Sequence, residues 1–416
     1  MAFASTANAG ITIPAGDWTV DIGGNVNAYY THKSTDDIRA SATVNGSSAT
    51  ANVAGSGFDD RSTIGTGLLP AAFGIGAKTR QNDLDIAFQF SFFTGTSSGG
   101  TAGNGVGAAG GGNNLNIRQA FVTFGDASWG TIKAGRDLGI FGSDAILSDM
   151  TLLGVGVSAA GASAAGGSST LGRIGSGYIY ADWKGQMSYT SPNWNGFQVA
   201  AGAMEGFNNG QQDLGYEAKA TYDFAANDVT GRVWLGGLTQ KTDKAGLSYT
   251  SKGFDIGAKV AYQGFGLVGY YYTGDGLDGQ VKQPTVDFTS ATTAVTTLYN
   301  TGISTGGLFN ATGFKTEDSG GYVQGTFVVP GVGTKLGVSY GQSNSKGAQG
   351  TLTGEVSNES YIVGAYHPLT KSLNLVAEYT QQEIEFKGTY TNGNNNATGK
   401  LSRESNTVSL GAILFF

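Results

Sequence analysis

The sequence predicts an all-β fold, a transmembrane antiparallel β-barrel of about 16 strands that forms a single unit over residues 10–416. Three observations favour this fold. Apolar and polar residues alternate with a period of two along much of the chain, the links between the alternating segments are short and long in turn, and the composition is unusual for a soluble protein.

The period-two alternation is clearest in Asp83–Phe93, Leu214–Phe224 and Phe254–Gln263. Each of these segments has Leu, Ile, Phe or Tyr on one face and mostly polar or small residues on the other. The short links are Gln81–Asp83, Gly125–Gly130, Pro192–Gly196, Ala225–Asp228, Gln263–Phe265, Pro330–Thr334 and Thr370–Ser372, and the long links are Thr31–Asp60, Thr94–Asn113, Leu138–Lys184, Gly274–Gly320, Asn344–Asn358 and Gly388–Ser402. Short turns at one end of a barrel and long loops at the other are typical of outer-membrane proteins.

The composition separates this chain of 416 residues from ordinary soluble proteins. Glycine supplies 70 residues, and charged residues make up only 13% of the chain, against roughly 25% in soluble domains. Mean hydropathy is −0.12, and no run of about 18 apolar residues marks a helical span. A membrane strand needs only about 9–11 residues with every second one apolar, so near-neutral hydropathy fits a barrel.

The charge balance and residue inventory exclude several kinds of chemistry. The net charge of −7 argues against a nucleic-acid partner, which needs clustered lysine and arginine. The chain has no cysteine, so disulfides and thiolate metal sites are excluded. Its two histidines, His32 and His367, leave little room for metal binding or general-base catalysis. We therefore expect no catalytic residue, no metal site and no cofactor.

The N-terminus fits the end of a secretion signal. Ala7-Asn8-Ala9 has the small-residue pattern of a signal-peptide cleavage site. We expect residues 1–9 to be the remnant of a signal peptide and the mature chain to begin near Gly10. A short alanine-rich tail is the alternative interpretation.

A barrel also follows from backbone hydrogen bonding. In hydrocarbon every backbone N–H and C=O group needs a partner within the protein, and a closed sheet provides one for each. A lysine or arginine facing lipid at the midplane costs roughly 2–4 kcal/mol, so charges within strands should face the interior. The strand charges on the polar faces are Lys78, Arg80, Arg118, Lys219, Arg232, Lys259, Asp21, Asp85, Glu217, Asp255 and Glu378. A soluble all-β protein with one wet face is the alternative.

Two stretches carry a resemblance to a known family. The last strand, Val408–Phe416, alternates and ends on phenylalanine, and Asn114–Gly156 contains Arg118-Gln119-Ala120-Phe121, then Gly135-Arg136, then Ser148-Asp149-Met150. Both resemble the general, trimeric Gram-negative outer-membrane porins. The resemblance implies a homotrimer in a bilayer with lipopolysaccharide, a C-terminal Phe416 read by the barrel-assembly machinery, and a third loop, here 138–183, folded into the barrel as a pore constriction. The alternation of short and long links separately predicts that 274–320 is a long external loop.

The family pattern assigns candidate residues to the constriction. By position, Arg118 falls on the barrel wall, Arg136 at the end of a strand, and Asp149 on the third loop. The family commonly has a second loop acid four residues later, where this chain has Leu153, so the acidic side is weaker. Asp144 is a possible substitute.

Further candidates for the constriction are Lys78, Arg80, Lys133 and Asp85. For each of them, a solvated interior residue without a special role is the simpler interpretation. Lys133 and Arg136 have opposite parity, so either one lies at a strand end or a bulge intervenes.

The expected function is a passive, water-filled pore for small hydrophilic solutes and ions in the bacterial outer membrane. With one loop acid missing, we hypothesise a mild anion preference. A substrate-selective channel of the same fold is the nearest alternative, with Tyr29 and Tyr270–Tyr272 as a possible aromatic track. An outer-membrane enzyme would depend on His32 or His367. A secreted glycine-rich adhesin would show a fixed repeat, and none is found.

Two literal matches to catalytic motifs lack the required context. Gly105–Gly110 spells G-x-G-x-x-G but leads into an expected strand instead of a helix. Gly95–Gly99 spells G-x-S-x-G within a glycine-rich loop and lacks the strand–turn–helix setting of a nucleophile elbow. We assign neither a function.

Overall fold

The computed structural model describes residues 10–44, 46–53, 60–95, 115–158, 170–206, 213–244, 247–277, 315–349, 352–392 and 395–416. Five segments discussed from the sequence lie wholly or mostly outside these residues. They are the signal-peptide remnant at 1–9, most of the external loop at 274–320, most of the loop at 94–113, and the two discounted glycine motifs.

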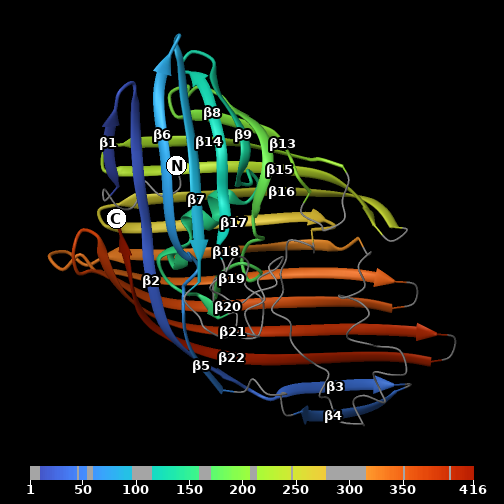
Figure 1. Ribbon diagram of the computed structural model, residues 1–416. Helices are drawn as coiled ribbons and strands as arrows, with labels where there is room; N and C mark the ends of the chain where they lie inside the picture. Colours follow the sequence, from blue (N-terminus) through green and yellow to red (C-terminus); the bar gives the residue numbers. More distant parts are fainter. Residues whose placement is uncertain are drawn as a thin grey trace.

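Sixteen antiparallel strands close into a barrel, as the sequence predicted (Figure 1). They are β2 (Trp18–Thr35), β5 (Asp60–Gly65) continued by β6 (Ala71–Gln81), β7 (Leu84–Thr94), β8 (Asn116–Asp126), β9 (Gly130–Leu138), β12 (Trp183–Thr190), β13 (Phe197–Met204), β14 (Gly215–Ala226), β15 (Val229–Lys244), β16 (Leu247–Tyr262), β17 (Phe265–Asp275), β18 (Glu317–Val328), β19 (Lys335–Gln349), β20 (Leu352–Pro368), β21 (Leu373–Asn392) and β22 (Asn395–Phe415). The short strand β1 (Ile11–Ala15) pairs with β2, and the hairpin of β3 (Ile38–Val44) and β4 (Ser47–Val53) extends β22.

The sheet closes at β2, the first long strand. Its residues Thr19–Asn25 pair with β6, and its residues Asn25–Thr35 pair with the last strand, β22. The C-terminal Phe416 completes the closure, because its backbone N–H and C=O both bond to Gly24, at 3.1 and 2.9 Å. A closed sheet leaves no unpaired edge, which satisfies the backbone requirement that favoured this fold.

The short links are tight turns, as predicted. Between β6 and β7 the residues Asn82 and Asp83 have φ of 49° and 62°, and between β16 and β17 Gln263 and Gly264 have φ of 45° and 86°. Two consecutive residues with positive φ are typical of the two-residue hairpins whose twist matches that of paired strands.

Along most of the barrel the strands have one apolar face and one polar face, and the burial of these faces is the reverse of that in a soluble protein. On β14, Tyr216 and Tyr222 are 61% and 46% exposed, whereas Glu217 and Thr221 on the other face are 5% and 6% exposed. An exposed apolar face is the surface that a membrane strand presents to lipid or to a neighbouring subunit. Within the described residues, no helix has the length and hydropathy to cross a bilayer.

For two of the predicted long links, the prediction of a loop is wrong, because the structure has paired strands there. Most of Asn344–Asn358 is a continuation of β19 and β20, and most of Gly388–Ser402 is a continuation of β21 and β22. These extensions were missed because polar residues occupy both faces, so no apolar stripe marks them as strands. Cross-strand contacts stabilise them instead, such as the ion pair of Lys346 with Glu355 at 3.5 Å. The predicted link Thr31–Asp60 likewise contains the β3–β4 hairpin.

Candidate functional site

The longest described interruption of the barrel is the segment from Gly139 to Asp182, which we call the β9–β12 segment after the strands that flank it. Its described parts are 139–158 and 170–182. They contain a short helix α1 (Ser143–Ser148), a 3-10 helix η1 (Met150–Leu153) and the paired strands β10 (Val157–Ser158) and β11 (Thr170–Gly172). Most of these residues are buried against the polar faces of strands from both halves of the barrel.

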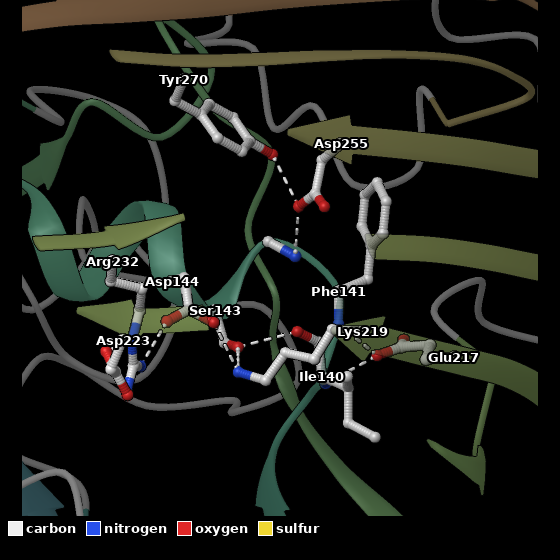
Figure 2. Close-up of polar contacts among 11 residues, drawn as sticks. Ile140, Phe141, Ser143, Asp144, Glu217, Lys219, Asp223, Arg232, Asp255 and Tyr270 are labelled. Atoms are coloured by element: carbon white, nitrogen blue, oxygen red, sulfur yellow. Dashed lines mark hydrogen bonds and ion pairs between the residues drawn. The ribbon is translucent and has the colours of Figure 1, made fainter. Parts of the chain in front are cut away.

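Two strand carboxylates hold the start of the segment through its backbone (Figure 2). Glu217 of β14 accepts hydrogen bonds from the N–H groups of Ile140 and Phe141, at 2.7 and 2.8 Å. Asp255 of β16 accepts one from the N–H of Gly142, at 3.1 Å. Gly142 has a φ of 72°, a conformation that glycine adopts without strain, and α1 begins directly after it. These carboxylates thereby fix where the helix starts.

A third carboxylate, Glu378 of β21, holds the middle of the segment. It accepts hydrogen bonds from the N–H groups of Val155 and Gly156, at 2.8 and 2.7 Å, and from the hydroxyl of Tyr366, at 2.6 Å. A Cβ at Gly154 would lie 2.0 Å from the Glu378 carboxylate, so this close approach requires glycine. The segment is therefore attached to β14 and β16 near its start and to β21 near its middle.

Asp144 of α1 is the centre of a charged network with strand side chains (Figure 2). Its carboxylate accepts from Lys219 of β14 at 2.6 Å and from Arg232 of β15 at 3.0 Å. Arg232 also binds Asp223 of β14 with two nitrogens, at 2.6 and 2.7 Å, the fork geometry that guanidinium and carboxylate groups prefer. Burial alone raises the pKa of Asp144, but Lys219 and Arg232 outweigh it, so the pKa lies below its usual value. Asp144 therefore stays ionised.

In the two ion pairs of Asp144 the base is more exposed than the acid, whereas Asp223, the second partner of Arg232, is 43% exposed against 29% for Arg232. The side chains of Lys219 and Arg232 are 23% and 29% exposed, but that of Asp144 is only 6% exposed. Lys133 of β9 repeats the arrangement, since its side chain is 29% exposed and that of its partner Asp137 is 8% exposed. In the pairs of Asp144 and Asp137 the basic side chain is thus the more accessible member and the acid is the more buried one.

The residues that the sequence placed at the constriction take different roles. Arg118 of β8 is 6% exposed, with its guanidinium 4.7 Å from the ring centre of Phe93 and 5.9 Å from that of Trp183. The β7–β8 register shifts beside it, between Ser91 and Phe92, which explains how Arg118 is buried although it shares the parity of outward residues further along β8.

The carboxylate of Asp149 accepts hydrogen bonds only from residues of its own segment among those described. It accepts from the N–H and the hydroxyl of Thr151, at 2.9 and 2.7 Å, and so caps the helix η1. It also accepts from the hydroxyl of Tyr178 at 2.6 Å, and Asp149 as a whole is 4% exposed. Burial and the neighbouring Asp149 raise the pKa of Tyr178 well above its usual value.

The other predicted residues lie away from the Asp144 network. Arg80 forms ion pairs with Asp85 at 2.9 Å and with Asp126 at 2.8 Å beside the tight turns of β6–β7 and β8–β9. Lys78 is 3.6 Å from Asp21, and both side chains are largely exposed. Arg136 is exposed and lies on the strand face opposite to that of Lys133 and Asp137.

The sequence did not identify the strand residues that bind the segment, although it placed them on the polar faces of their strands. Lys219, Arg232, Glu217, Asp255 and Glu378 all carry the parity of the polar face. What the pattern did not contain was their pairing with Asp144 or with backbone N–H groups more than 70 residues away. Within the described ranges, no group of three His, Asp or Glu side chains is arranged to hold a metal ion.

The tyrosines considered as an aromatic track are packed instead. Tyr270 and Tyr272 are 5% and 0% exposed and belong to one cluster with Phe141 and Tyr178 of the segment, while Tyr271 points to the apolar face and is 51% exposed. The hydroxyl of Tyr29 donates to the backbone of Leu153 at 2.8 Å. These rings support the segment and leave no exposed aromatic row among the described residues considered for such a track.

Comparison with known proteins adds the family and the fold. A family model described as Gram-negative porin matches residues 1–387. No curated protein is similar enough in sequence to match this chain.

Several solved structures share the fold. An anion-selective porin from Comamonas acidovorans has 14% identity and a TM-score of 0.57, with 96% of this chain and 100% of that chain covered. The outer membrane channel DcaP of Acinetobacter baumannii has 14% identity and a TM-score of 0.54, with 95% and 99% covered. The trimer form of OmpT from Vibrio cholerae has 14% identity and a TM-score of 0.50, with 96% and 99% covered.

Proposed function

This chain belongs to the Gram-negative porin family, and from that premise we propose that the β9–β12 segment narrows its channel and that the lining favours anions mildly. As a porin it is a passive diffusion channel of the bacterial outer membrane. Family and fold point to a channel rather than an enzyme. The solutes are small and hydrophilic, because a polar face lines the interior of such a barrel.

The attachment of the segment supports its role as a constriction. Its partners Glu217, Asp255 and Glu378 all lie on polar strand faces, which in a membrane barrel face the interior. A segment bonded to the polar faces of β14, β16 and β21 occupies part of the cross-section that these strands enclose. The constriction therefore lies between the β9–β12 segment and the strand faces that it leaves uncovered.

The anion preference rests on one observation, the unequal exposure within the ion pairs of Asp144 and Asp137, although Asp223 beside Arg232 is an exposed acid that acts in the opposite direction. Lys219, Arg232 and Lys133 present partly exposed cationic groups, while Asp144 and Asp137 are almost fully buried behind them. An ion in the channel meets the exposed group first, and fixed charges at a narrow opening select by sign. The similar barrel from Comamonas acidovorans is described as anion-selective, which is consistent with this proposal.

We extend the proposal to assembly. We propose a homotrimer whose exposed apolar faces contact lipid, lipopolysaccharide and neighbouring subunits, and for which the terminal Phe416 is the assembly signal. The trimer form of the similar Vibrio cholerae barrel supports the stoichiometry. The position of Phe416 against Gly24 at the closure of the barrel is consistent with a role in assembly.

Single-channel recording in a planar bilayer under a salt gradient tests the proposal. We expect ohmic openings in groups of three and a reversal potential with the sign of anion movement. A strong cation preference would contradict the assignment of selectivity, and openings that occur only singly would contradict the trimer. A folded, heat-modifiable barrel that never conducts would contradict an open channel.

A further inference from the structure

We infer that Lys259 of β16 is the residue that determines the charge selectivity of this channel. The inference deepens the proposed anion preference and rests on it. It follows from a comparison of the basic side chains on the polar faces of the strands that surround α1. The question for each is whether a carboxylate already offsets its charge.

Lys259 lies on the polar face of β16, the strand that also carries Asp255. Along this strand Asp255 and Gly257 are buried on the polar face, and Ile256 on the other face is 48% exposed. Lys259 has the parity of Asp255. It stands directly opposite Arg232 of β15 in the register of the sheet, and it is exposed. Its ammonium group thus borders the space beside the Asp144 network.

The neighbouring charges cancel one another. Lys219 and Arg232 contribute two positive charges, and Asp144 and Asp223 contribute two negative charges, all joined by contacts of 2.6–3.0 Å. Lys184 is likewise offset by Glu217 at 2.5 Å. The field of such a close pair falls off faster with distance than that of a single charge, because the two charges act in opposite directions on a passing ion, so a pair selects by sign only at short range, through its more exposed member.

Lys259 adds one positive charge that this network does not offset. Within the described residues, no carboxylate lies within 4.0 Å of its ammonium group, although Asp223 acts on it from a greater distance. A like charge directly opposite on a neighbouring strand is unfavourable, and here the carboxylates around Arg232 relieve that repulsion. Lys219, Arg232 and Lys259 together with Asp144 and Asp223 therefore carry one net positive charge, and Lys259 is the base among them that no carboxylate contacts. Asp255 on the same face is 2% exposed and is bound to Gly142 and Tyr270.

A second lysine contributes less. Lys335, at the start of β19, also has no carboxylate within ion-pair distance among the residues that the structure describes. Its ammonium group lies 4.8 Å from the ring centre of Tyr366, and the residue is only partly exposed. A cation held over an aromatic ring and partly covered acts more weakly on solution ions than an exposed one. We therefore expect Lys259 to dominate.

The test is the reversal potential of the full-length protein in planar bilayers under a potassium chloride gradient, with Lys259→Gln and Lys259→Glu. We expect the chloride-to-potassium permeability ratio to fall towards one in K259Q and below one in K259E. Both shifts should shrink at about 1 M salt, where the screening length is about 3 Å. Single-channel conductance and heat-modifiability show whether each variant forms an intact barrel.

Lys252→Glu is the matched control, because Lys252 is exposed on the same strand but has the parity of Ile256 on the apolar face. We expect this variant to keep the wild-type reversal potential. An anion-selective wild type with an unchanged ratio in K259E would overturn the inference and leave the proposed function standing. A wild type without anion preference would instead contradict the proposed selectivity itself. Equal shifts in K252E and K259E would show a general surface-charge effect and would also overturn the inference.

Discussion

The polar faces that hold the β9–β12 segment differ between two regions of the barrel. Strands β18–β20 hold it through neutral groups, such as the hydroxyls of Ser339, Ser343 and Ser360 and the amide of Gln324. Strands β14–β16 hold it through charges, including Lys219 and Arg232. Neutral hydrogen bonds fix a geometry but have almost no field at a distance, whereas partly exposed charges also act on ions in solution.

The difference separates two properties of the channel. The neutral region should determine mainly how firmly the segment is held and therefore how wide the opening is. The charged region should determine mainly which sign of ion passes. Substitutions in the two regions should consequently change different observables, and that separation is open to direct test.

The largest effect on channel size is expected from the neutral region, around Arg173 of the segment. Arg173 is 0% exposed and donates to the hydroxyls of Ser339 and Ser360, at 2.7 and 3.0 Å. Burial lowers its pKa, and each hydrogen bond to a charged group contributes about 1.5–3 kcal/mol. The double variant S339A/S360A should therefore loosen the segment and raise both conductance and open-channel noise, with an unchanged reversal potential.

The control for this prediction is Ser357→Ala. Ser357 lies on β20 with the parity of the apolar face and accepts a hydrogen bond from Gln342 at 2.8 Å, so it does not touch the segment. The S357A variant should have the single-channel conductance and open-channel noise of the wild type. A shifted reversal potential in S339A/S360A would mean that the neutral region also controls selectivity, and the comparison would fail.

The next largest effect is expected on selectivity, from Asp144→Asn in the charged region. The substitution removes the acid that Lys219 and Arg232 share, so it exposes one uncompensated positive charge. The chloride-to-potassium permeability ratio should rise. The asparagine side chain would keep part of the hydrogen bonding, so conductance should change less than in S339A/S360A. An unchanged permeability ratio would show that the Asp144 network has no effect on the ion selectivity of the channel.

The same variant gives a pH prediction. The pKa of Asp144 is below its ordinary value, so its ion pairs stabilise the folded segment fully above the unfolded carboxyl pKa of about 3.9 and are lost as pH falls through the lower folded pKa. The difference in permeability ratio between wild type and D144N should therefore stay constant from about pH 8 to about 4 and shrink only below that. A difference that already disappears near pH 6 would contradict this assignment.

Local pattern was sufficient to predict most of the barrel. The alternation in Leu214–Phe224 correctly predicted the exposed and buried faces of β14, and positions such as Asn82-Asp83 marked tight turns. The alternation does not mark the strands where they extend into polar hairpins, because both faces are polar there and no apolar stripe is present. Cross-strand ion pairs and register maintain those extensions, and neither can be read from one strand alone.

The candidate site was predicted less well, for a physical reason. Which acid of the segment meets the strand bases depends on how the chain folds between Gly139 and Asp182, and not on spacing. The sequence favoured Asp149, but a helix begins there and its carboxylate caps that helix, whereas Asp144 projects from α1 towards β14 and β15. Likewise, the role of Arg118 depends on a bulge that one strand's sequence does not reveal.

The smallest effect on selectivity is expected from Arg118→Gln, although the sequence placed this residue at the constriction. Its guanidinium lies against Phe93 and Trp183, and the residue is 6% exposed, so little of its charge faces the channel. The variant should keep the wild-type reversal potential but lose about 0.5–2 kcal/mol of cation–π stabilisation, seen as a lower temperature of heat modification. Arg118→Lys keeps the charge but not the planar stacking, so it should show the same loss in part. A shift in permeability ratio as large as that of K259Q would instead place Arg118 at the narrow part of the channel, and selectivity would then not be confined to β14–β16.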